Sequence, residues 1–195
     1  MKIGFIQSFP KFGEKERNVR GAVERMSEVE ADLVVLPELF NSGYLFRSVQ
    51  ELEELSEEIP EGFTTQTLME IARKRSTYVV GGLPERAGKI FYNSAVLVGP
   101  EGFIDLYRKA HLFADEPKWF EKGDTPFRVH DIGLARVGVL ICFDWIFPEA
   151  ARTLALRGAD IICHPSNLVL PYCQKAMVTR SLENGLFSIT CNRIG

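Results

Sequence analysis

The amino-acid sequence predicts a layered α/β domain built on a mixed β-sheet. Short runs of β-branched and apolar residues alternate with longer segments in which apolar residues recur at helical spacing. Two expected strands are separated only by the turn Gly99-Pro-Glu-Gly102, which indicates a hairpin and hence an antiparallel pair. The 195 residues suffice for one hydrophobic core, and they contain no internal repeat or linker. We therefore expect residues 1–195 to form a single domain.

The first half of the chain should contain three strands and three helices. The apolar run 32–37 has no polar face, which is typical of a strand buried on both sides. Thr64 or Thr65 can cap the helix that runs to Arg75, because a threonine hydroxyl accepts a hydrogen bond from a free backbone N–H. The expected strands are residues 2–7, 32–37 and 77–82, and the expected helices are residues 19–29, 51–59 and 64–75.

The second half continues this alternation. Pro148 suits the first turn of a helix, and Gly158 and Gly185 each follow the end of a helical pattern. This order predicts helical crossovers packed on the sheet, together with one hairpin. The expected strands are residues 93–98, 103–108, 136–142, 160–163 and 186–192, and the expected helices are residues 150–157 and 174–184.

Composition and charge exclude several classes of function. Hydrophobic residues make up 46% of the chain and charged residues 25%, and the net charge is −3. This balance offers no electrostatic reason to expect nucleic acid or an anionic membrane as a partner. No apolar run is long enough to span a bilayer, and the N-terminus lacks the pattern of a signal peptide. We therefore expect a cytoplasmic protein.

The cysteines and histidines do not form a metal-binding pattern. The four cysteines show no CxxC spacing, and there are only three histidines, so we expect no metal. Cys163 and Cys191 lie within apolar strand patterns and are interpreted as core residues. Cys173 lies in a loop or at the start of a helix and has no assigned role.

Cys142 differs from the other cysteines because it ends an apolar run and precedes a helical pattern. A strand that stops at a thiol and turns into a helix is expected to form an elbow that exposes the side chain and the next backbone N–H. Thiols at helix N-termini have a lowered pKa and raised reactivity. The alternative is a buried core cysteine, the commoner state of this residue type.

Glu38 and Lys109 each follow a predicted buried strand, and Cys142 ends another. Polar residues at strand ends are where α/β folds place their chemistry. A carboxylate beside a thiol can act as its general base, and an ammonium can stabilise both anions and a developing oxyanion. The backbone N–H of Phe143 would assist at the oxyanion. The simpler alternative is that each residue marks the point where a strand leaves the core for solvent.

A cysteine–histidine mechanism through His111 is a rival arrangement. His111 precedes Leu112 and Phe113, so a packed, structural position is the favoured interpretation. No partner can be identified from the sequence for His130 or His164.

Several segments, taken together and in order, resemble the nitrilase (carbon–nitrogen hydrolase) superfamily. This resemblance covers essentially the whole chain and implies a four-layer αββα sandwich with mixed sheets. The matching segments are Leu36-Pro-Glu-Leu-Phe40, Tyr92-Asn-Ser-Ala95, Tyr107-Arg-Lys-Ala-His-Leu-Phe113, Ile141-Cys-Phe-Asp-Trp-Ile-Phe-Pro-Glu149, His164-Pro-Ser-Asn167 and Arg180-Ser-Leu-Glu-Asn184.

The resemblance implies a role for each site residue. Glu38 would be the general base, Lys109 the transition-state stabiliser and Cys142 the nucleophile. The second active-site glutamate of the family falls at Glu116, with Asp115 as the alternative alignment, and would orient Lys109 and the substrate.

By the same likeness, the pocket would be shaped by Tyr44, Trp145 and Asn167. Trp145 could equally belong to the core, and Tyr44 to a surface loop. Three further residues match a motif that we interpret as structural, because helical spacing lets them tie a helix to neighbouring loops: Arg180, Glu183 and Asn184.

The resemblance is closest to small archaeal nitrilase-like and aliphatic amidase-like members. It implies hydrolysis of a small aliphatic amide or nitrile through a cysteine thioester, with no cofactor and with a homodimer or higher oligomer as the assembly. Amide substrates are placed ahead of nitriles, and a carbamoyl-amide hydrolase is an alternative. Family members usually continue past the segment matched by residues 192–195, so the chain is expected to lack the C-terminal strands. A truncated pseudoenzyme or association module is therefore the second hypothesis.

Overall fold

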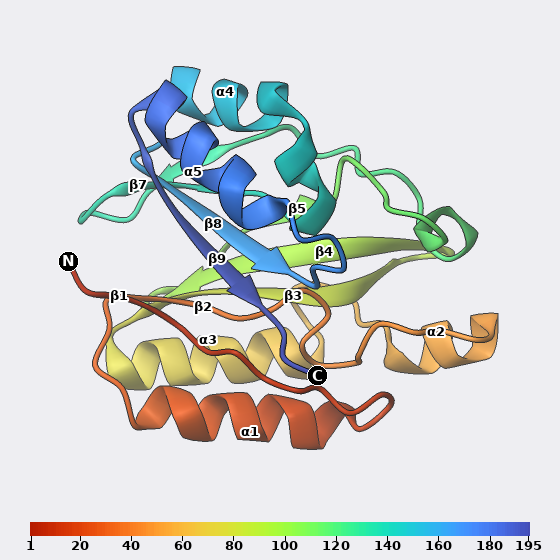
Figure 1. Cartoon of the computed structure of the whole chain (residues 1–195). Helices are drawn as coiled ribbons and strands as arrows, with labels where there is room; N and C mark the ends of the chain where they lie inside the picture. The colour runs from red at the N-terminus through yellow and green to blue at the C-terminus, as the bar shows by residue number, and fades with distance from the viewer.

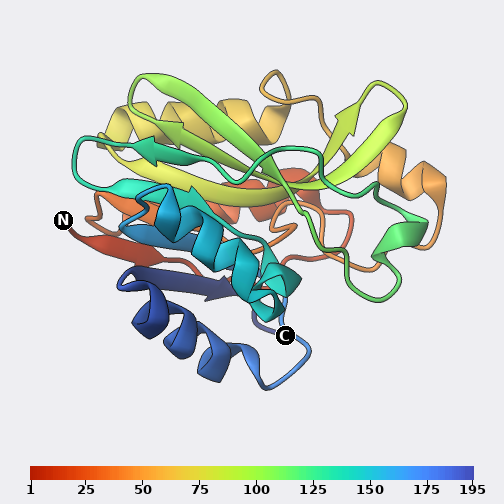
Figure 2. The same cartoon turned by 90° about the horizontal axis from the view of Figure 1, so that it is seen from above.

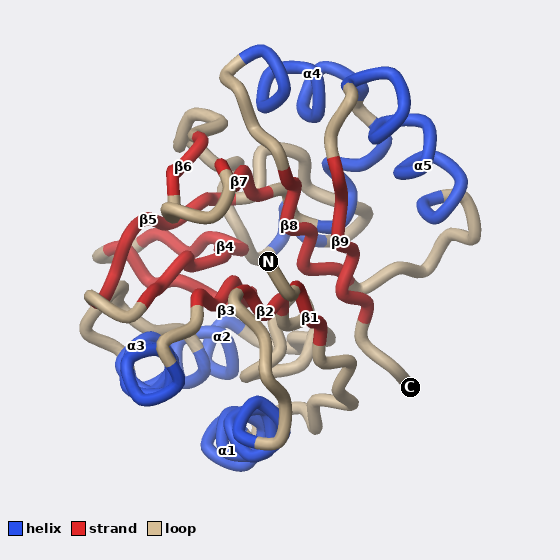
Figure 3. The backbone as a smooth tube through the Cα atoms, turned by 90° about the vertical axis from the view of Figure 1, so that its left-hand side faces the viewer, coloured by secondary structure: helices blue, strands red, loops and turns tan.

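The computed structural model describes residues 1–195 as two β-sheets packed face to face, with helices covering the outer face of each sheet (Figure 1). The same four layers are seen from the side in Figure 3. This architecture confirms the αββα sandwich with mixed sheets that the resemblance implied.

The first sheet has five strands in chain order. Its first three strands run parallel, and its last three are joined by antiparallel hairpins. The strands are β1 (Ile3–Phe5), β2 (Leu33–Val35), β3 (Tyr78–Ala87), β4 (Ile90–Gly99) and β5 (Gly102–Arg108).

The second sheet has four strands, also in chain order. One antiparallel pair, β6–β7, is followed by two parallel pairs. The strands are β6 (Val129–Asp131), β7 (Arg136–Val139), β8 (Ile161–Ser166) and β9 (Phe187–Asn192).

The helices divide between the two outer layers. α1 (Lys15–Ser27) and α3 (Phe63–Arg75) cover the first sheet, and the short α2 (Val49–Leu55) lies near one end of it, against β3. α4 (Pro148–Leu156) and α5 (Cys173–Asn184) lie side by side over the second sheet (Figure 2). None of these helices combines the length and the apolar character needed to cross a bilayer.

β2 shows how one strand serves two cores. Leu33 and Val35 point into the core between the sheets, which they share with Ile161 of β8. Val34 points the other way and packs against Val19 of α1. All three β2 side chains are at most 2% exposed, which confirms the prediction of a strand buried on both faces.

The residue pattern by itself, without the family resemblance, did not give the number of sheets. The residue pattern alone suggested one mixed sheet, whereas the chain leaves the first sheet after β5 and starts a second at β6. β6 was not predicted, because it has only three residues and two of them, His130 and Asp131, are polar. Hydrophobic periodicity identifies strands but does not say which strands pair.

Three predicted helices had wrong boundaries, and the first of them, α1, begins at Lys15 rather than at residue 19. Helix α2 ends at Leu55 because Glu57 turns back towards β3, where its backbone N–H bonds the Pro84 carbonyl oxygen at 3.0 Å. Helix α3 has Gly62 at its cap position, and the predicted caps Thr64 and Thr65 lie buried inside the first turns. The Thr64 hydroxyl donates a hydrogen bond to Glu57 Oε1 at 2.9 Å, so it ties the helix to this loop.

Gly82 of β3 gives a test of how tightly the sheet holds the Glu38 turn. A Cβ atom at this position would lie 2.7 Å from Glu38 Cα. We expect Gly82→Ala to lower the free energy of unfolding by about 2 kcal/mol, because backbone atoms must move to admit the methyl group. Urea denaturation measures this change.

The control is Gly21→Ala on α1, where the nearest atom to a new Cβ is the flexible Arg25 guanidinium at 3.9 Å. Alanine there should raise the stability by up to about 1 kcal/mol. Equal changes in the two variants would contradict the close contact at Gly82.

Candidate active site

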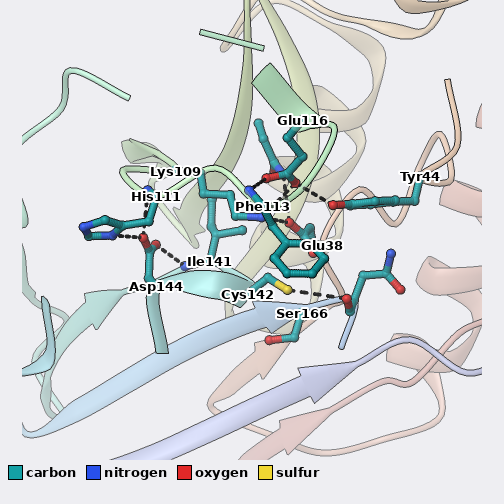
Figure 4. Close-up of polar contacts among 12 residues, drawn as sticks. Glu38, Tyr44, Lys109, His111, Phe113, Glu116, Ile141, Cys142, Asp144 and Ser166 are labelled. Carbon is teal, nitrogen blue, oxygen red and sulfur yellow. Dashed lines mark hydrogen bonds and ion pairs between the residues drawn. The ribbon is translucent and has the colours of Figure 1, made fainter. Parts of the chain in front are cut away.

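Lys109 is a buried cation held between two carboxylates (Figure 4). Its Nζ atom lies 2.7 Å from Glu38 Oε1 and 2.8 Å from Glu116 Oε1, and the three side chains are at most 3% exposed. Glu38 follows β2, Lys109 follows β5, and Glu116 opens the short 3-10 helix η1 (Glu116–Lys118). The interpretation of Glu38 and Lys109 as strand ends leaving for solvent is therefore wrong.

Glu116, rather than Asp115, belongs to this cluster. The Asp115 carboxylate is 77% exposed and pairs with Lys118 at 2.9 Å on the surface. The Glu116 carboxylate faces inward, and its Oε2 accepts a hydrogen bond from the backbone N–H of Phe113 at 2.6 Å. The solvent-facing alternative for Glu116 is also wrong.

Two polar side chains complete the coordination of the carboxylates. Asn93 Nδ2, from the middle of β4, donates to Glu38 Oε1 at 2.8 Å and to Glu116 Oε1 at 2.9 Å. The Tyr44 hydroxyl donates to Glu116 Oε1 at 2.8 Å, which places Tyr44 at the site rather than in a free surface loop. The second oxygen of Glu38, Oε2, is buried and has no hydrogen-bond partner in the protein.

Cys142 sits at the predicted elbow, in a strained conformation. β7 ends at Val139, and the 3-10 helix η2 (Cys142–Ile146) leads into α4. The backbone φ of Cys142 is +39°, in the left-handed region that a non-glycine residue seldom adopts. Its Sγ–H donates to the Asn167 carbonyl oxygen at 3.4 Å, and the residue is only 5% exposed. The expectation that the elbow exposes this side chain was therefore wrong.

The carboxylate and the ammonium both act on the thiol. Burial raises the pKa of Cys142 well above its usual range, the negative charge of Glu38 raises that pKa further, and Lys109 opposes this rise. The sulfur is drawn close to Glu38 and Lys109 in Figure 4. The thiol is therefore protonated at rest, which corrects the expectation of a lowered pKa: desolvation outweighs the effect of a helix N-terminus.

The other two members of the cluster respond differently to burial. Burial raises the pKa of the Glu38 carboxyl, although the Lys109 ammonium opposes this shift. For Lys109, burial disfavours the ammonium, but the attraction of Glu38 and its other anionic neighbours outweighs it and raises the pKa above its ordinary value. Lys109 stays charged, and Glu38 is a stronger base than an exposed glutamate.

Asp144 and His164 hold the backbone on either side of the Cys142 Cα. Asp144 Oδ2 accepts the N–H of Ile141 at 2.9 Å, and His164 Nε2 donates to the Cys142 carbonyl oxygen at 2.8 Å. Both side chains are fully buried. These two contacts are well placed to hold the unfavourable φ of Cys142, and sequence reasoning assigned neither of them.

His111 pairs with Asp144 rather than with the thiol. Its Nδ1 lies 2.7 Å from Asp144 Oδ1, and its ring stacks on Phe147 with ring centroids 3.7 Å apart. This geometry favours the packed, structural interpretation over a cysteine–histidine pair. The sequence also left two other histidines without partners, but His130 bonds Asp105 and the second nitrogen of His164 lies near Thr190.

The remaining cysteines and the motif on α5 are structural. Cys163 and Cys191 are fully buried in the core between the sheets, as predicted, and Cys173 is buried at the start of α5. Arg180 Nη2 approaches the Ile146 carbonyl oxygen of η2 at 3.4 Å, so this motif links helix and loop as expected. No group of three or more potential metal ligands is present among the side chains.

Two of the three expected pocket residues, Trp145 and Asn167, lie beside the thiol, whereas Tyr44 lines a separate cavity. A shallow hollow beside Cys142 is lined by Phe143, Trp145 and Asn167. Trp145 also packs against Met177 of α5, so it serves both the core and the pocket. Asn167 contacts the sulfur through its backbone carbonyl rather than its side chain.

This arrangement provides the parts of a nucleophilic hydrolase. It combines a protonated thiol, a carboxylate with a free oxygen, a permanent cation and an apolar hollow for the rest of the substrate. Asn93 was not predicted as a site residue. The available signal was an amide side chain within a predicted strand, because a buried amide requires a hydrogen-bond partner. Sequence reasoning also missed Asp144 and His164, whose partners lie in distant segments.

Comparisons with known proteins show the family to which the chain belongs. Residues 9–195 match the family model of carbon–nitrogen hydrolases. The chain is 50% identical to a nitrilase of Pyrococcus abyssi over 198 residues, covering 100% of this chain and 76% of the relative. It is 36% identical to an (R)-stereoselective amidase of a Pseudomonas species over 200 residues, covering 100% and 72%.

A solved structure extends the likeness to three dimensions. The amidase from a Nesterenkonia species superposes with a TM-score of 0.84 at 27% sequence identity, covering 100% of this chain and 76% of the amidase. Fold and site thus define a hydrolase of carbon–nitrogen bonds. The chain belongs to the carbon–nitrogen hydrolase family, within the nitrilase superfamily.

Asp144 should be essential to the stability of the turn that carries Cys142. Its carboxylate accepts hydrogen bonds from Ile141 N–H, His111 N–H and the Tyr107 hydroxyl at 2.8–3.2 Å. Asp144→Asn turns one acceptor into a donor that faces these N–H groups, and should lower the free energy of unfolding by about 2–4 kcal/mol. In urea denaturation, the exposed Asp115→Asn should change it by no more than about 0.5 kcal/mol. Similar values for both variants would contradict the assignment.

His164 should make the protein sensitive to acid. Burial lowers the pKa of His164 from 6.5 to about 4. The unfolded chain therefore binds a proton at this residue at a higher pH than the folded chain does. Stability should be complete above pH 6.5 and should fall as the pH drops towards 4, by up to about 3 kcal/mol.

Urea midpoints measured between pH 7 and pH 4 test this dependence. His164→Gln should flatten the decline, because glutamine does not titrate. His130→Gln, which removes a partly exposed histidine paired with Asp105, should not flatten it. An unchanged decline in His164→Gln would refute the role assigned to this histidine.

Proposed function

We propose that the protein hydrolyses the carbon–nitrogen bond of a small aliphatic amide through a thioester on Cys142. The observation that carries this proposal is the buried Lys109, held between two carboxylates of which one, Glu38, keeps a free oxygen near the thiol. A permanent cation, a base and a protonated nucleophile in one water-poor site suit acyl transfer. Glu38, Lys109 and Cys142 are the proposed triad, with Glu116 positioning Lys109.

In the first half of the reaction, Glu38 Oε2 takes the proton from the Cys142 thiol. The sulfur forms a bond to the amide carbon, and the carbonyl electron pair moves to oxygen. Lys109 Nζ and the backbone N–H of Phe143 stabilise this oxyanion, and each such donor typically contributes roughly 3 kcal/mol. Glu38 then gives its proton to the nitrogen, the carbon–nitrogen bond breaks, and ammonia leaves a thioester behind.

In the second half, Glu38 takes a proton from water, and the hydroxide oxygen attacks the thioester carbon. The sulfur leaves as the carbon–sulfur bond breaks and regains the proton, which releases the carboxylic acid. Every proton passes through residues of this chain, so the cycle requires no cofactor.

The relatives support an amide substrate and a reactive thiol. The Pseudomonas relative is named an (R)-stereoselective amidase. In one structure of the Nesterenkonia amidase, an active-site cysteine carries the product of Michael addition of acrylamide. Because the Pyrococcus relative at 50% identity is named a nitrilase, a nitrile is the second candidate substrate, and it would pass through a thioimidate instead of an oxyanion.

The cellular setting is also a proposal. All four cysteines are free thiols, which supports the reducing cytoplasm as the compartment. We propose a single domain that pairs into a homodimer through α4 and α5, whose outer faces expose apolar side chains. These are Leu156, Val178 and Leu182, at 60–79% exposure.

Replacement of the nucleophile tests the proposal directly. Cys142→Ala should reduce ammonia release from the best amide at least ~1000-fold, because removing the nucleophile of a concerted triad costs nearly the whole of covalent catalysis. Cys163→Ala removes a buried thiol elsewhere in the core and should retain activity. A trapped acyl adduct, located by mass spectrometry, should map to Cys142 alone.

Two outcomes would overturn the proposal. Full activity in Cys142→Ala would exclude the thioester. If the folded wild-type chain releases no ammonia from short amides, nitriles or carbamoyl compounds, the alternative of a pseudoenzyme that keeps the pocket without turnover would stand.

A further inference from the structure

Two hollows meet at the side chain of Phe113. The shallow hollow beside Cys142 is lined on one side by Phe113 and on the others by Trp145 and the segment 167–170. A larger cavity of about 260 Å³ holds Tyr44 and Glu116 in its wall. Phe113 is the only residue that lines both spaces, and Figure 4 shows its ring between Glu116 and Cys142.

The backbone of Phe113 is tied to the charged cluster, and its ring lies against Phe143. Its N–H donates to Glu116 Oε2 at 2.6 Å, and the next residue, Ala114, has a φ of +47°. The ring packs against Phe143 with centroids 4.9 Å apart and planes inclined by 58°. A change of side chain at this position should therefore alter the separation between the two hollows, while the backbone N–H keeps its hydrogen bond to Glu116.

The position of the charged cluster decides which part of an amide faces the hollow. In the proposed reaction, the oxygen of the amide must approach Lys109 and its nitrogen must approach Glu38. The third substituent of the attacked carbon, the acyl chain, then points away from the cluster. The hollow lined by Phe113, Trp145 and Leu168 lies beside Cys142, and its volume of only about 10 Å³ has room for no more than the first atoms of this acyl chain.

The chemistry of this hollow restricts the acyl chain. Apart from the Cys142 thiol it has no ionisable side chain, and its one other polar residue is Asn167. A carboxylate or ammonium placed there would lose its hydration without gaining a partner. A methylene chain would instead gain about 0.8 kcal/mol for each buried CH₂.

We infer that the hollow beside Cys142 is the acyl subsite, that it selects amides of short, uncharged aliphatic acids, and that Phe113 is the residue that limits acyl length. This inference rests on the proposed function and goes beyond it by assigning specificity to one side chain. Removal of the ring joins the acyl subsite to the larger cavity and makes room for longer chains.

Steady-state ammonia release from propanamide, pentanamide and succinamate, all with the same leaving group, tests the inference. In the wild type, kcat/KM for pentanamide should exceed that for succinamate, its charged counterpart of similar length, by about 10-fold or more. In Phe113→Ala, the ratio of kcat/KM for pentanamide to that for propanamide should rise about 10-fold or more, with Phe113→Leu in between. Phe113→Trp should lower this ratio.

Phe63→Ala is the matched control, because it removes a partly exposed phenylalanine at the start of α3, away from the site. It should leave the ratio unchanged. If wild-type ammonia release depends on Cys142 but neither Phe113→Leu nor Phe113→Trp moves the ratio, the inference fails and the proposed function survives. A wild-type preference for succinamate would also overturn the uncharged acyl subsite. Absence of Cys142-dependent release from every amide would instead refute the proposed function itself.

Discussion

The buried ammonium of Lys109 is the charge around which the site is arranged. A lysine this far from water is stable only while its partners are present, and removing one partner of a buried ion pair typically costs about 3–5 kcal/mol. Lys109 has two carboxylate partners, so the cluster carries an excess negative charge that needs further donors. Asn93, Tyr44 and the N–H of Phe113 supply them. Each donor comes from a different segment, so the electrostatics of one cation constrain much of the first sheet and its loops.

The turn that carries Cys142 is held by a second network that meets the first. Asp144 contacts Ile141 just before Cys142. It also contacts Tyr107 and His111, which lie two residues before and two residues after Lys109. One buried carboxylate thus joins the segment that carries the sulfur to the segment that carries the cation. His164 holds the other side of the Cys142 peptide. Strain at a single residue is tolerated because neighbours on both sides determine its conformation.

The sequence was sufficient to predict those site residues that are marked by a local sequence pattern. Glu38, Lys109 and Cys142 stand out because each is a reactive residue directly after an apolar run, and the strand–turn–helix elbow at Cys142 follows from the same pattern. No local pattern marks Asn93, Asp144 or His164, because the role of each depends on hydrogen-bond partners from distant segments.

The depth to which Cys142 is buried could not be predicted from the sequence either. The pKa of Cys142 was expected to be lowered by the helix start, but the residue is desolvated, and desolvation acts in the opposite direction. The division of the strands into two sheets could not be predicted from the residue pattern either, because periodicity does not encode which strands pair.

The raised pKa values of the thiol and of Glu38 have a common consequence for the proposed reaction. Forming a new ion in so dry a site would be costly. Transfer of the proton from sulfur to Glu38 forms no additional ion: a carboxylate beside Lys109 is replaced by a thiolate beside the same Lys109, while Glu116 keeps its charge. Because the total charge of the cluster is conserved, the ammonium compensates the anion before and after the transfer. The site can therefore keep its thiol protonated and unreactive at rest, yet activate it without bringing charge in from solvent.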